Sequence, residues 1–432
     1  MKATFNAIGC AALLALAGCQ HPAATRTAPL PSTATIQADT DAIFAKLVTV
    51  RRDLHQHPEL AGGETRTADK EAAYLLDIGL QVQRGPYGNS VIAILNGARP
   101  GRTVVWRADL DALPGFYPDP EPFRSTNKDV HHACGHDVHI AVALGIAEVL
   151  SRHRTTLAGN VVFVFQPEEE TFAGARNLIE KGVLDKLSAS GIYGMHSTAF
   201  PVGELRVRVA EMFAHQRRVR ITLRDELTAK EVDQLVKQVQ SAMFRARPGA
   251  RPWALQQLFD PTVGVAAPDT AFQDFTFMDA DFTTRREGGE LNLETYLYET
   301  SSEAVATVIP RIRQAVTAAG QQGRLRDVQF VQANPTVFND PKLTALATKA
   351  IQAAYGPDAV KPLYGQAPYF NDDFAYFQQK VPGVYFFVGG ANFEKGLIAF
   401  NHAPNFRVDE ESIRVAVTRF SSLMVARAGG QD

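Results

Sequence analysis

The sequence predicts an α/β protein that carries a second, α+β unit inserted into its chain. Short apolar, β-branched runs alternate with segments of helical periodicity over most of the length. At 432 residues the chain exceeds the roughly 250 to 300 residues at which one core usually stops growing, so two structural units are expected. The alternation is interrupted between about residues 214 and 325, where a separate β-α-β-β-α pattern occurs.

The first α/β stretch begins with helical spacing from Asp39 to Leu60, and a second helix is predicted from Thr65 to Gly79. Buried strands and the helices between them follow. The strands are predicted at Val91–Leu95, Thr103–Arg107, Val161–Phe165 and Ile192–Met195, and the helices at Val138–Arg152 and Ala173–Gly182. In such sheets the working residues gather where strands end, so the acidic and histidine-containing segments after these strands are candidates.

The inserted unit and the end of the chain complete the prediction. Inside the insertion we expect the strand Arg218–Leu223, the helix Thr228–Phe244, strands near Phe275–Thr284 and Leu291–Tyr298, and the helix Ser302–Ala319. After Gly323 the first pattern resumes, with a helix at Pro341–Tyr355 and a strand at Gly383–Val388. The first unit is therefore expected over 40–213 and 326–428, and the inserted unit over 214–325.

The N-terminus has the layout of an export signal. Lys2 precedes an apolar run, Ala7 to Ala17, that is too short to span a bilayer. Small residues before Cys19 resemble the signal of bacterial lipoproteins, in which Cys19 becomes acylated; an ordinary signal with an incidental cysteine is the alternative. We expect a signal peptide over 1–19, a disordered linker over 20–39 and a lipid-anchored protein at the periplasmic face, on the outer membrane because Gln20 is not aspartate.

Composition excludes several kinds of partner. A net charge of -2 gives no clustered positive charge for nucleic acid. No later stretch approaches the ~20 apolar residues of a membrane span, so membrane contact is expected only through the lipid anchor. Cys134 is the only cysteine left after the signal and Cys19, which rules out an intrachain disulfide and leaves a thiol for which a bound metal is one explanation.

A dense group of metal-binding residue types lies between His131 and His139. Cys134 and His136 are a soft and a borderline ligand two positions apart, and Gly135 permits a tight turn between them. Taken alone, this segment could also be a solvated polar loop.

Three adjacent carboxylates, Glu168 to Glu170, follow the predicted strand Val161–Phe165. They repel one another unless a cation neutralises them, and one metal ligand beside one general base is a natural use of such a group. A plain acidic loop is the alternative. His196 after a further predicted strand and His402 near the C-terminus carry no weight singly, because lone histidines are often structural.

Eight motifs occur in the order found in the dimetal aminoacylase and carboxypeptidase family. They are Arg51–Leu60 (RRDLHQHPEL), Arg107–Pro114 (RADLDALP), Ser125–His139 (STNKDVHHACGHDVH), Gln166–Ala175 (QPEEETFAGA), Gly194–Gly203 (GMHSTAFPVG), Asn339–Leu343 (NDPKL), Asn371–Gly389 (NDDFAYFQQKVPGVYFFVG) and His402–Glu411. The chain resembles this family from about Ile43 to Val417, except for the inserted unit. Within it, the branch of hippurate hydrolases and plant auxin-conjugate (IAA-amino acid) hydrolases is nearest.

The resemblance implies a three-layer catalytic domain with a mixed central sheet and an inserted ferredoxin-like lid or dimerisation domain, with a homodimer as one assembly. It also implies two divalent ions, zinc or manganese. Their ligands would be Cys134, His136, Glu170, His196 and His402, with Cys134 near both ions. Glu169 matches the general base and Asp111 the aspartate that orients a metal-ligating group, whereas Asp109 stands where more distant relatives carry a histidine.

The implied activity is hydrolysis of the amide bond of small N-acyl amino acids or short peptides in the cleft between the domains. Glu169 would take a proton from a water molecule that bridges the ions and return it to the leaving amine. A small-peptide carboxypeptidase or dipeptidase of the same family stays open. So do a surface-tethered, metal-containing binding protein that has lost turnover and a metal-free structural protein with polar loops.

The inserted unit departs from the family pattern. Relatives have Gly-Gly-His after its first strand, and that histidine helps to stabilise the oxyanion; here Arg224, Asp225 and Glu226 follow. The family's Asn-Val-Ile-Pro segment is also not recognisable. Loss of one oxyanion donor typically costs about 100-fold to 1000-fold in turnover. His215, Arg217 or Arg218 are the candidates to substitute.

Overall fold

The computed structural model describes residues 29–115, 119–185 and 187–431. The expected signal 1–19, with the lipidation site Cys19, lies outside the described residues, so the signal and the lipid anchor stay predictions. Helix α1 (Thr33–Gln56) begins where the side chain of Ser32 accepts a hydrogen bond from the Thr35 backbone N–H at 3.1 Å. The linker expected over 20–39 is therefore wrong from Thr33 onward, because Ile36 and Thr40 are buried against the core.

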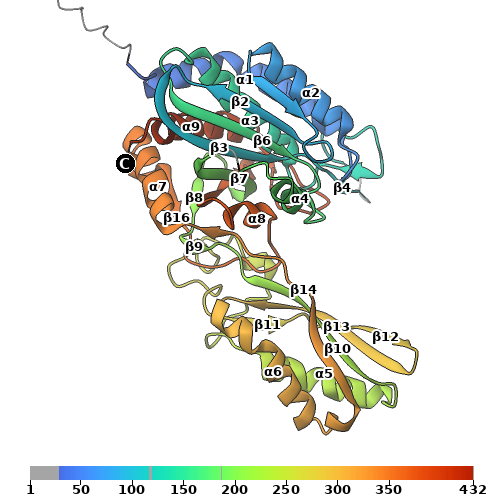
Figure 1. The fold of residues 1–432 in the computed structure, drawn as a ribbon. Helices are drawn as coiled ribbons and strands as arrows, with labels where there is room; N and C mark the ends of the chain where they lie inside the picture. Colours follow the sequence, from blue (N-terminus) through green and yellow to red (C-terminus); the bar gives the residue numbers. More distant parts are fainter. Residues whose placement is uncertain (1–28, 116–118, 186, 432) are drawn as a thin grey trace, which may run out of the picture.

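An eight-stranded mixed sheet forms the centre of the larger unit (Figure 1). In spatial order its strands are β1 (Gln81–Arg84), β2 (Val91–Asn96), β6 (Ala158–Gln166), β3 (Arg99–Asp109), β7 (Ala189–Pro201), β17 (Gly383–Ala391), β8 (Leu205–Val207) and β16 (Lys361–Pro362). The four central strands β6, β3, β7 and β17 run parallel. Their carboxyl ends therefore meet at one edge of the sheet, which we call the carboxyl edge.

Helices cover both faces of this sheet, so the fold has the predicted three layers. One face carries α1, α2 (Thr65–Asp77), α3 (His136–Arg152), α7 (Pro341–Tyr355) and α9 (Glu411–Ala428), and the other carries α4 (Gly174–Glu180) and α8 (Phe374–Gln378). Along β6, Val161 and Phe163 pack with the first set of helices, whereas Val162 and Val164 pack with the second. This alternation explains why the central strands are apolar throughout and buried on both faces.

The predicted strands are present, and several are longer than predicted. Strand β7 continues past Met195 to Pro201, because β17 pairs with it as far as that residue. His196 therefore lies inside a strand and not after one. Short elements complete this unit: β4 (Leu113–Pro114), β5 (Val130–His131), β9 (Ala210–Glu211), β15 (Phe338–Asn339), η3 (Pro357–Ala359) and η4 (Phe393–Lys395). Within the described residues, none of the helices has the length and apolar character needed to cross a bilayer.

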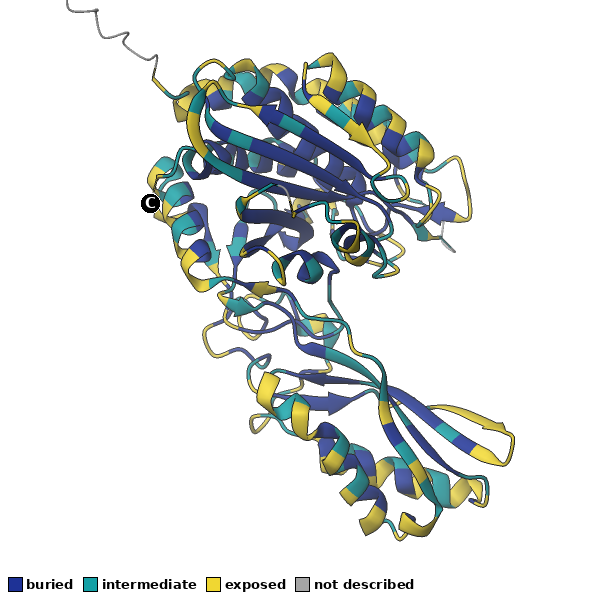
Figure 2. Cartoon of the chain, in the orientation of Figure 1, coloured by how far each residue is buried: buried dark blue, intermediate teal, exposed yellow. Residues whose placement is uncertain are grey.

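The inserted unit, which we call the lid, has its own antiparallel sheet. Its strands are β10 (His215–Arg224), β11 (Thr276–Met278), β12 (Thr283–Glu287), β13 (Glu290–Glu299) and β14 (Leu325–Gln332), and its helices are α5 (Ala229–Met243) and α6 (Ser302–Ala318), with the short η2 (Gln322–Arg324). The order β11-β13-β10-β14, with both helices packed on the sheet, is ferredoxin-like as predicted. The outer faces of these helices are exposed (Figure 2).

The predicted boundary between residues 325 and 326 is wrong. Strand β14 pairs with β10 through partners such as Ile221 and Val328, so it belongs to the lid sheet and the boundary falls after Gln332. The sequence did not reveal this strand because a register shift next to Leu223 interrupts the apolar alternation along β14.

A long connection from Arg245 to Phe275, which contains η1 (Leu255–Gln257), runs from the lid back to the larger unit. We call residues 245–275 the bridging segment; its loops lie at the junction of the two units (Figure 1). Val265 and Phe272 share a core with Phe387 of β17. The backbone N–H of Gln366 donates to the carbonyl of Phe272 at 2.9 Å, which fixes the segment against the larger unit.

Candidate metal centre

The five predicted ligands converge at the carboxyl edge of the large sheet from four separate stretches of chain. The Cys134 Sγ lies 3.3 Å from His196 Nε2 and 3.2 Å from His402 Nε2. The Oε1 of Glu170 lies 3.2 Å from His402 Nε2 and 3.9 Å from His136 Nε2. The structure thus brings together every ligand that the family resemblance implied.

These ligand atoms form two overlapping groups. One contains Cys134, His136 and His196, the other Cys134, Glu170 and His402, and within each group all ligand atoms lie within 4.8 Å of one another. A tetrahedral ion with nitrogen at about 2.1 Å and sulfur at about 2.3 Å holds its ligand atoms roughly 3.5 Å apart, close to the spacing here. Cys134 belongs to both groups, as expected for a thiol near two ions.

Hydrogen bonds to the backbone orient two of the imidazole rings. The Nδ1 of His136 lies 2.7 Å from the carbonyl of Asp111, and the Nδ1 of His196 lies 2.9 Å from the carbonyl of Ser197. Since a carbonyl can only accept, each Nδ1 carries a proton and donates, which turns each Nε2 toward the centre.

Unpartnered buried atoms show that a cation fits this centre. His136 Nε2 is buried and has no hydrogen-bond partner within the described part of the chain, and the buried Glu170 Oε1 makes no hydrogen bond there although His402 Nε2 lies 3.2 Å away. Such atoms are costly unless something binds them. A set of thiol, imidazole and carboxylate donors suits zinc, and the imidazole and carboxylate members also suit manganese.

Asp111 fixes the two glutamates that follow β6. Its Oδ1 accepts the backbone N–H of Glu169 at 3.0 Å, and its Oδ2 accepts that of Glu170 at 2.9 Å. Glu64 of the larger unit, which we did not identify from the sequence, accepts the N–H of Glu168 at 2.9 Å. Because Glu168 has a left-handed backbone (φ 57°), these bonds hold a strained turn in place.

The ligand loops are also tied to one another. The Asn401 side-chain amide donates to the carbonyls of Cys134 and Ser197, both at 3.0 Å. Gly135 has φ 93°, and a Cβ added there would lie 2.3 Å from Ser197 Oγ, so only glycine fits this turn. These contacts fix the position of the Cys134 thiol beside β7.

Crowded acidic groups dominate the electrostatics. Burial raises the pKa of the Cys134 thiol well above its usual value, and the carboxylates of Glu170 and Glu169 raise it further. Burial also raises the pKa of Glu169, with Asp372 and Glu170 adding to the shift. A divalent cation opposes these shifts by favouring the thiolate and the carboxylate. Burial lowers the pKa of His136, but Asp109 and Asp111 outweigh it and raise that pKa to about 10.

Asp109 lies behind the proposed ligands and is not itself one of them. Its Oδ1 is 2.6 Å from His139 Nδ1, and its Oδ2 is 2.5 Å from Arg107 Nη1. The same arginine contacts Asp373 at 2.8 Å. Asp109 therefore joins a buried ion-pair network that supports His136, whose Nε2 lies 3.9 Å away.

A cavity of about 280 Å³, the metal pocket, opens onto these ligands. Besides the ligands Cys134, Glu170, His196 and His402, and Glu169, it is lined by Phe172, Phe213, Tyr369, Phe370, Phe387, Phe400, Leu255, Gln216, Asn371 and Asn401. Gln216 comes from the lid and Leu255 from the bridging segment. The lining is therefore mainly aromatic, with three amides as its neutral polar groups.

The three candidates to substitute for the family's lid histidine do not line the metal pocket of their own chain. His215 and Arg217 line a different hollow, and Arg218 pairs with Glu294 at 2.6 Å. Side chains alternate along a strand, so Gln216 points to the opposite face from its two neighbours and into the metal pocket. Period-two alternation along β10 could have separated His215 and Arg217 from Gln216, but the sequence did not show which face looked toward the metals.

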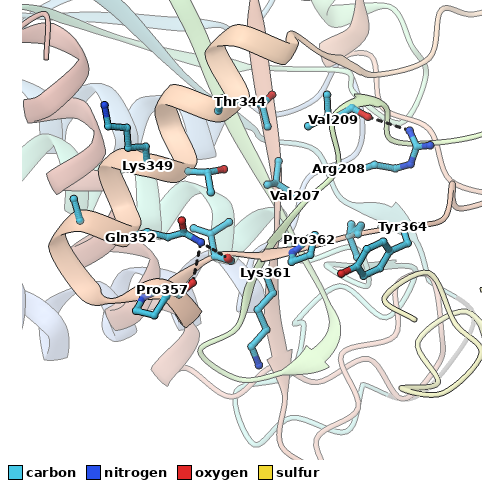
Figure 3. A pocket seen from close by; sticks show the side chains of 15 residues that line it. Val207, Arg208, Val209, Thr344, Lys349, Gln352, Pro357, Lys361, Pro362 and Tyr364 are labelled. Atoms are coloured by element: carbon cyan, nitrogen blue, oxygen red, sulfur yellow. Dashed lines mark hydrogen bonds between the residues drawn. The ribbon is translucent and has the colours of Figure 1, made fainter. Parts of the chain in front are cut away.

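A hollow larger than the metal pocket lies elsewhere. It measures about 850 Å³ and is formed by α7 and β16, with Thr344, Gln352 and Tyr364 among its lining residues (Figure 3). None of the predicted site residues lines it, so its size does not make it the candidate site.

Comparison with known proteins shows the family. The sequence profile of the peptidase family M20/M25/M40 matches residues 105–426. The chain belongs to this family. The N-acetylcysteine deacetylase of Bacillus subtilis is 29% identical over 399 residues, which cover 89% of this chain and 97% of that protein. The thermostable carboxypeptidase 1 of Saccharolobus solfataricus is 28% identical and covers 88% of this chain and 94% of its own.

Solved structures agree with this family. The YXEP protein of Bacillus subtilis, a dinuclear metal-binding peptidase of the M20 family, matches with a TM-score of 0.72 and 28% identity, over 89% of this chain and 98% of its own. A putative aminohydrolase from methicillin-resistant Staphylococcus aureus shares the fold with a TM-score of 0.74 at 23% identity, over 92% of this chain and all of its own.

Family membership makes this chain a dimetal hydrolase of the amidohydrolase and metallopeptidase type. The family resemblance, the fold class, the enzyme class and the two divalent metal ions are confirmed. The roles of the individual residues, the substrate and a homodimer stay predictions.

Proposed function

We propose that the protein cleaves the amide bond of small N-acyl amino acids, with Glu169 as general base. One observation carries this proposal: the Glu169 carboxyl lies at the wall of a small, mainly aromatic pocket whose floor is formed by the metal ligands. Its Oε2 is 3.9 Å from His136 Nε2, so this carboxyl reaches the space beside the proposed ligands.

The chain's own residues suit a proton transfer. Two divalent ions held by Cys134, His136, Glu170, His196 and His402 would supply the positive charge that polarises an amide carbonyl and acidifies a water molecule. The Glu169 carboxylate accepts the proton from the attacking water and then donates it to the leaving amine nitrogen. Asp111 positions Glu169 through the backbone N–H described above. The proton that Glu169 takes from the water is the one it gives to the amine, so its carboxylate is regenerated at the end of the reaction.

The pocket lining favours an acyl group over a C-terminal carboxylate. None of the described residues that line the metal pocket is Lys or Arg, so the lining itself suits the acyl part of a substrate better than the terminal carboxylate, which N-acyl amino acids and peptides both carry. The aromatic walls suit an apolar acyl group. Asn371 donates its amide to the carbonyl of Pro335 at 3.0 Å, which leaves a buried, unpartnered Oδ1 as an acceptor for the substrate N–H.

A small-peptide carboxypeptidase is the second candidate, because relatives of similar identity are named as a carboxypeptidase and as a deacetylase. A peptide substrate needs the same ions and the same base. The two candidates differ in what the apolar pocket receives, an acyl group or a peptide side chain.

Hydrolysis of a substrate panel tests the proposal. Protein loaded with zinc or manganese would be assayed with N-acetyl amino acids, N-benzoyl amino acids and dipeptides, and a chelated sample would serve as the control. We expect the N-acyl substrates to have the higher kcat/KM and chelation to abolish it. Faster dipeptide cleavage would support the carboxypeptidase. No turnover by protein that retains both ions would support a binding protein.

Location and assembly remain separate proposals. We infer an exported, lipid-anchored protein from Lys2, the apolar run Ala7 to Ala17 and Cys19. Metabolic labelling with a fatty acid, compared between wild type and Cys19→Ser, tests the anchor. Sedimentation of the soluble part tests whether two copies associate.

A further inference from the structure

A second hollow lies beside the metal pocket, on the lid side. It measures about 480 Å³ and is walled by Phe244, Trp253, Phe277 and Met278 of the lid and bridging segment. Tyr369 of the larger unit lines both this hollow and the metal pocket. We call it the aromatic hollow; Tyr369 is the wall that the two cavities share.

Tyr369 is held in this place against a backbone cost. Its φ of 64° is left-handed, a conformation that a residue with a Cβ rarely adopts. Its ring packs 4.6 Å from the ring of Tyr298 and 5.7 Å from that of Phe277. Its hydroxyl lies 3.4 Å from the carbonyl of Trp253. Contacts with the lid and the bridging segment thus set the ring of Tyr369 between the two cavities.

The aromatic hollow has the chemistry of an apolar binding site. Phe244 is 49% exposed and Trp253 45% exposed, and their rings lie 5.7 Å apart. Among the described residues that line the hollow, Asp279 is the one ionisable residue besides Tyr369, and burial raises the pKa of its carboxyl. The side-chain amide of Gln240 donates hydrogen bonds to the carbonyls of Asp279 and Ala280. The hollow therefore offers aromatic faces and no cation, which suits an uncharged aromatic or alkyl group.

We propose that the aromatic hollow is a second substrate subsite, which takes an aromatic or alkyl group at the far end of the substrate, joined to the cleaved amide by a chain that passes Tyr369. This inference rests on the proposed function, because it needs an amide substrate in the metal pocket. Because Tyr369 lines both cavities, they adjoin at this residue, which argues for the substrate as the occupant. A second copy of this chain is the other possible occupant, and the test separates the two.

The test compares substrates that differ only in reach. One series carries N-acetyl and N-(5-phenylpentanoyl) groups on the same amino acid; the other compares N-acetylglycine with N-acetylphenylalanine. In one of the two series, wild type should have a kcat/KM at least about 10-fold higher for the longer substrate than for the shorter one. If this is the acyl series, the acyl side of the amide reaches the hollow; if it is the amino-acid series, the amine side does. A 10-fold change corresponds to about 55 Å² of apolar contact.

Trp253→Ala should remove most of this preference and leave kcat/KM for the shorter substrate within about 2-fold. Phe244→Ala should act in the same direction more weakly. The matched control is Phe393→Ala, an aromatic residue that is 64% exposed and lines neither cavity. Tyr369→Phe should keep the preference because it keeps the ring, and thermal unfolding of each variant identifies any that fail to fold.

Several results would overturn the subsite. Wild type could show no preference for the longer member of either series, or Trp253→Ala could lower both members equally although the variant is folded. Trp253→Ala could also change the sedimentation coefficient with no selective loss, which would make the hollow an interface between two copies. Absence of turnover on every substrate would instead count against the proposed function itself.

Discussion

The carboxyl edge of the large sheet and the lid contribute differently to the same pocket. At the edge, hydrogen bonds orient the buried charged side chains. Asp111, for example, accepts the backbone N–H groups of Glu169 and Glu170. The lid side contributes Gln216 and Leu255, and the Gln216 side chain makes no hydrogen bond to another residue in the described part of the chain. The difference supports the proposal that the sheet edge performs the chemistry and the lid selects the substrate.

The largest effect should come from the base at the edge. Glu169→Gln removes the proton acceptor and preserves the shape of the side chain, so we expect kcat to fall roughly 100-fold to 10,000-fold while both ions stay bound. Steady-state kinetics and elemental analysis of the same sample measure the two quantities. The matched control is Glu168→Gln, because Glu168 bonds to the Tyr87 hydroxyl at 2.8 Å and does not line the metal pocket. Full activity in Glu169→Gln would show that Glu169 is not the general base.

Asp111→Asn should have the next largest effect. An amide at this position turns a donor toward the N–H of Glu169 or Glu170, so one of the two bonds is lost and the turn shifts. We expect a fall of about 10-fold to 100-fold in metal affinity or kcat. Competition with a chelator measures the affinity, and Asp77→Asn on the exposed end of α2 is the control. An unchanged affinity and kcat would show that Asp111 does not position the glutamates.

On the lid, Gln216→Leu should cost less. A hydrogen bond to a neutral group is worth about 0.5 to 1.5 kcal/mol, so kcat/KM should fall by about 2-fold to 13-fold. His215→Gln, one residue away on the other face of β10, should change it less. A loss as large as that of Glu169→Gln would break the comparison, because it would place part of the chemistry on the lid.

The last prediction concerns stability and lies away from both regions. Burial raises the pKa of Glu71 well above 4.5, and neither carboxyl oxygen has a hydrogen-bond partner within the described residues. Above pH 4.5 the unfolded chain releases this proton and the folded chain keeps it, so stability falls by about 1.4 kcal/mol per pH unit until the folded pKa is reached. Glu71→Gln should therefore match wild type at pH 4 and be more stable at pH 8. Denaturant unfolding at both values measures this, and equal pH slopes would contradict it.

The ligands could be predicted from sequence because each occurs inside a motif with a local cause. Cys134 and His136 flank a glycine that the turn requires, and Glu170 lies four residues after the end of an apolar strand. The family order of these motifs then indicated that they meet, which spacing alone could not. The end of the linker was misjudged because Ile36 and Thr40 become buried only through packing with distant residues.

The lid side of the pocket could not be predicted. Leu255 and Tyr369 are about a hundred residues apart along the chain, and no periodicity links them. Their meeting depends on the bridging segment, whose Val265 and Phe272 join the core of the larger unit through irregular backbone. Tertiary packing sets such contacts, so the sequence did not show that Gln216 lines the metal pocket and its neighbours His215 and Arg217 do not.

The measurement that tests the central claim most directly is anomalous X-ray diffraction from crystals loaded with zinc or manganese. The account predicts two peaks per chain, both within bonding distance of Cys134 Sγ, one toward His196 and one toward His402. It also predicts that Cys134→Ala loses or displaces both. A single ion away from Cys134, or ions held by other residues, would contradict the shared centre on which the proposed chemistry depends.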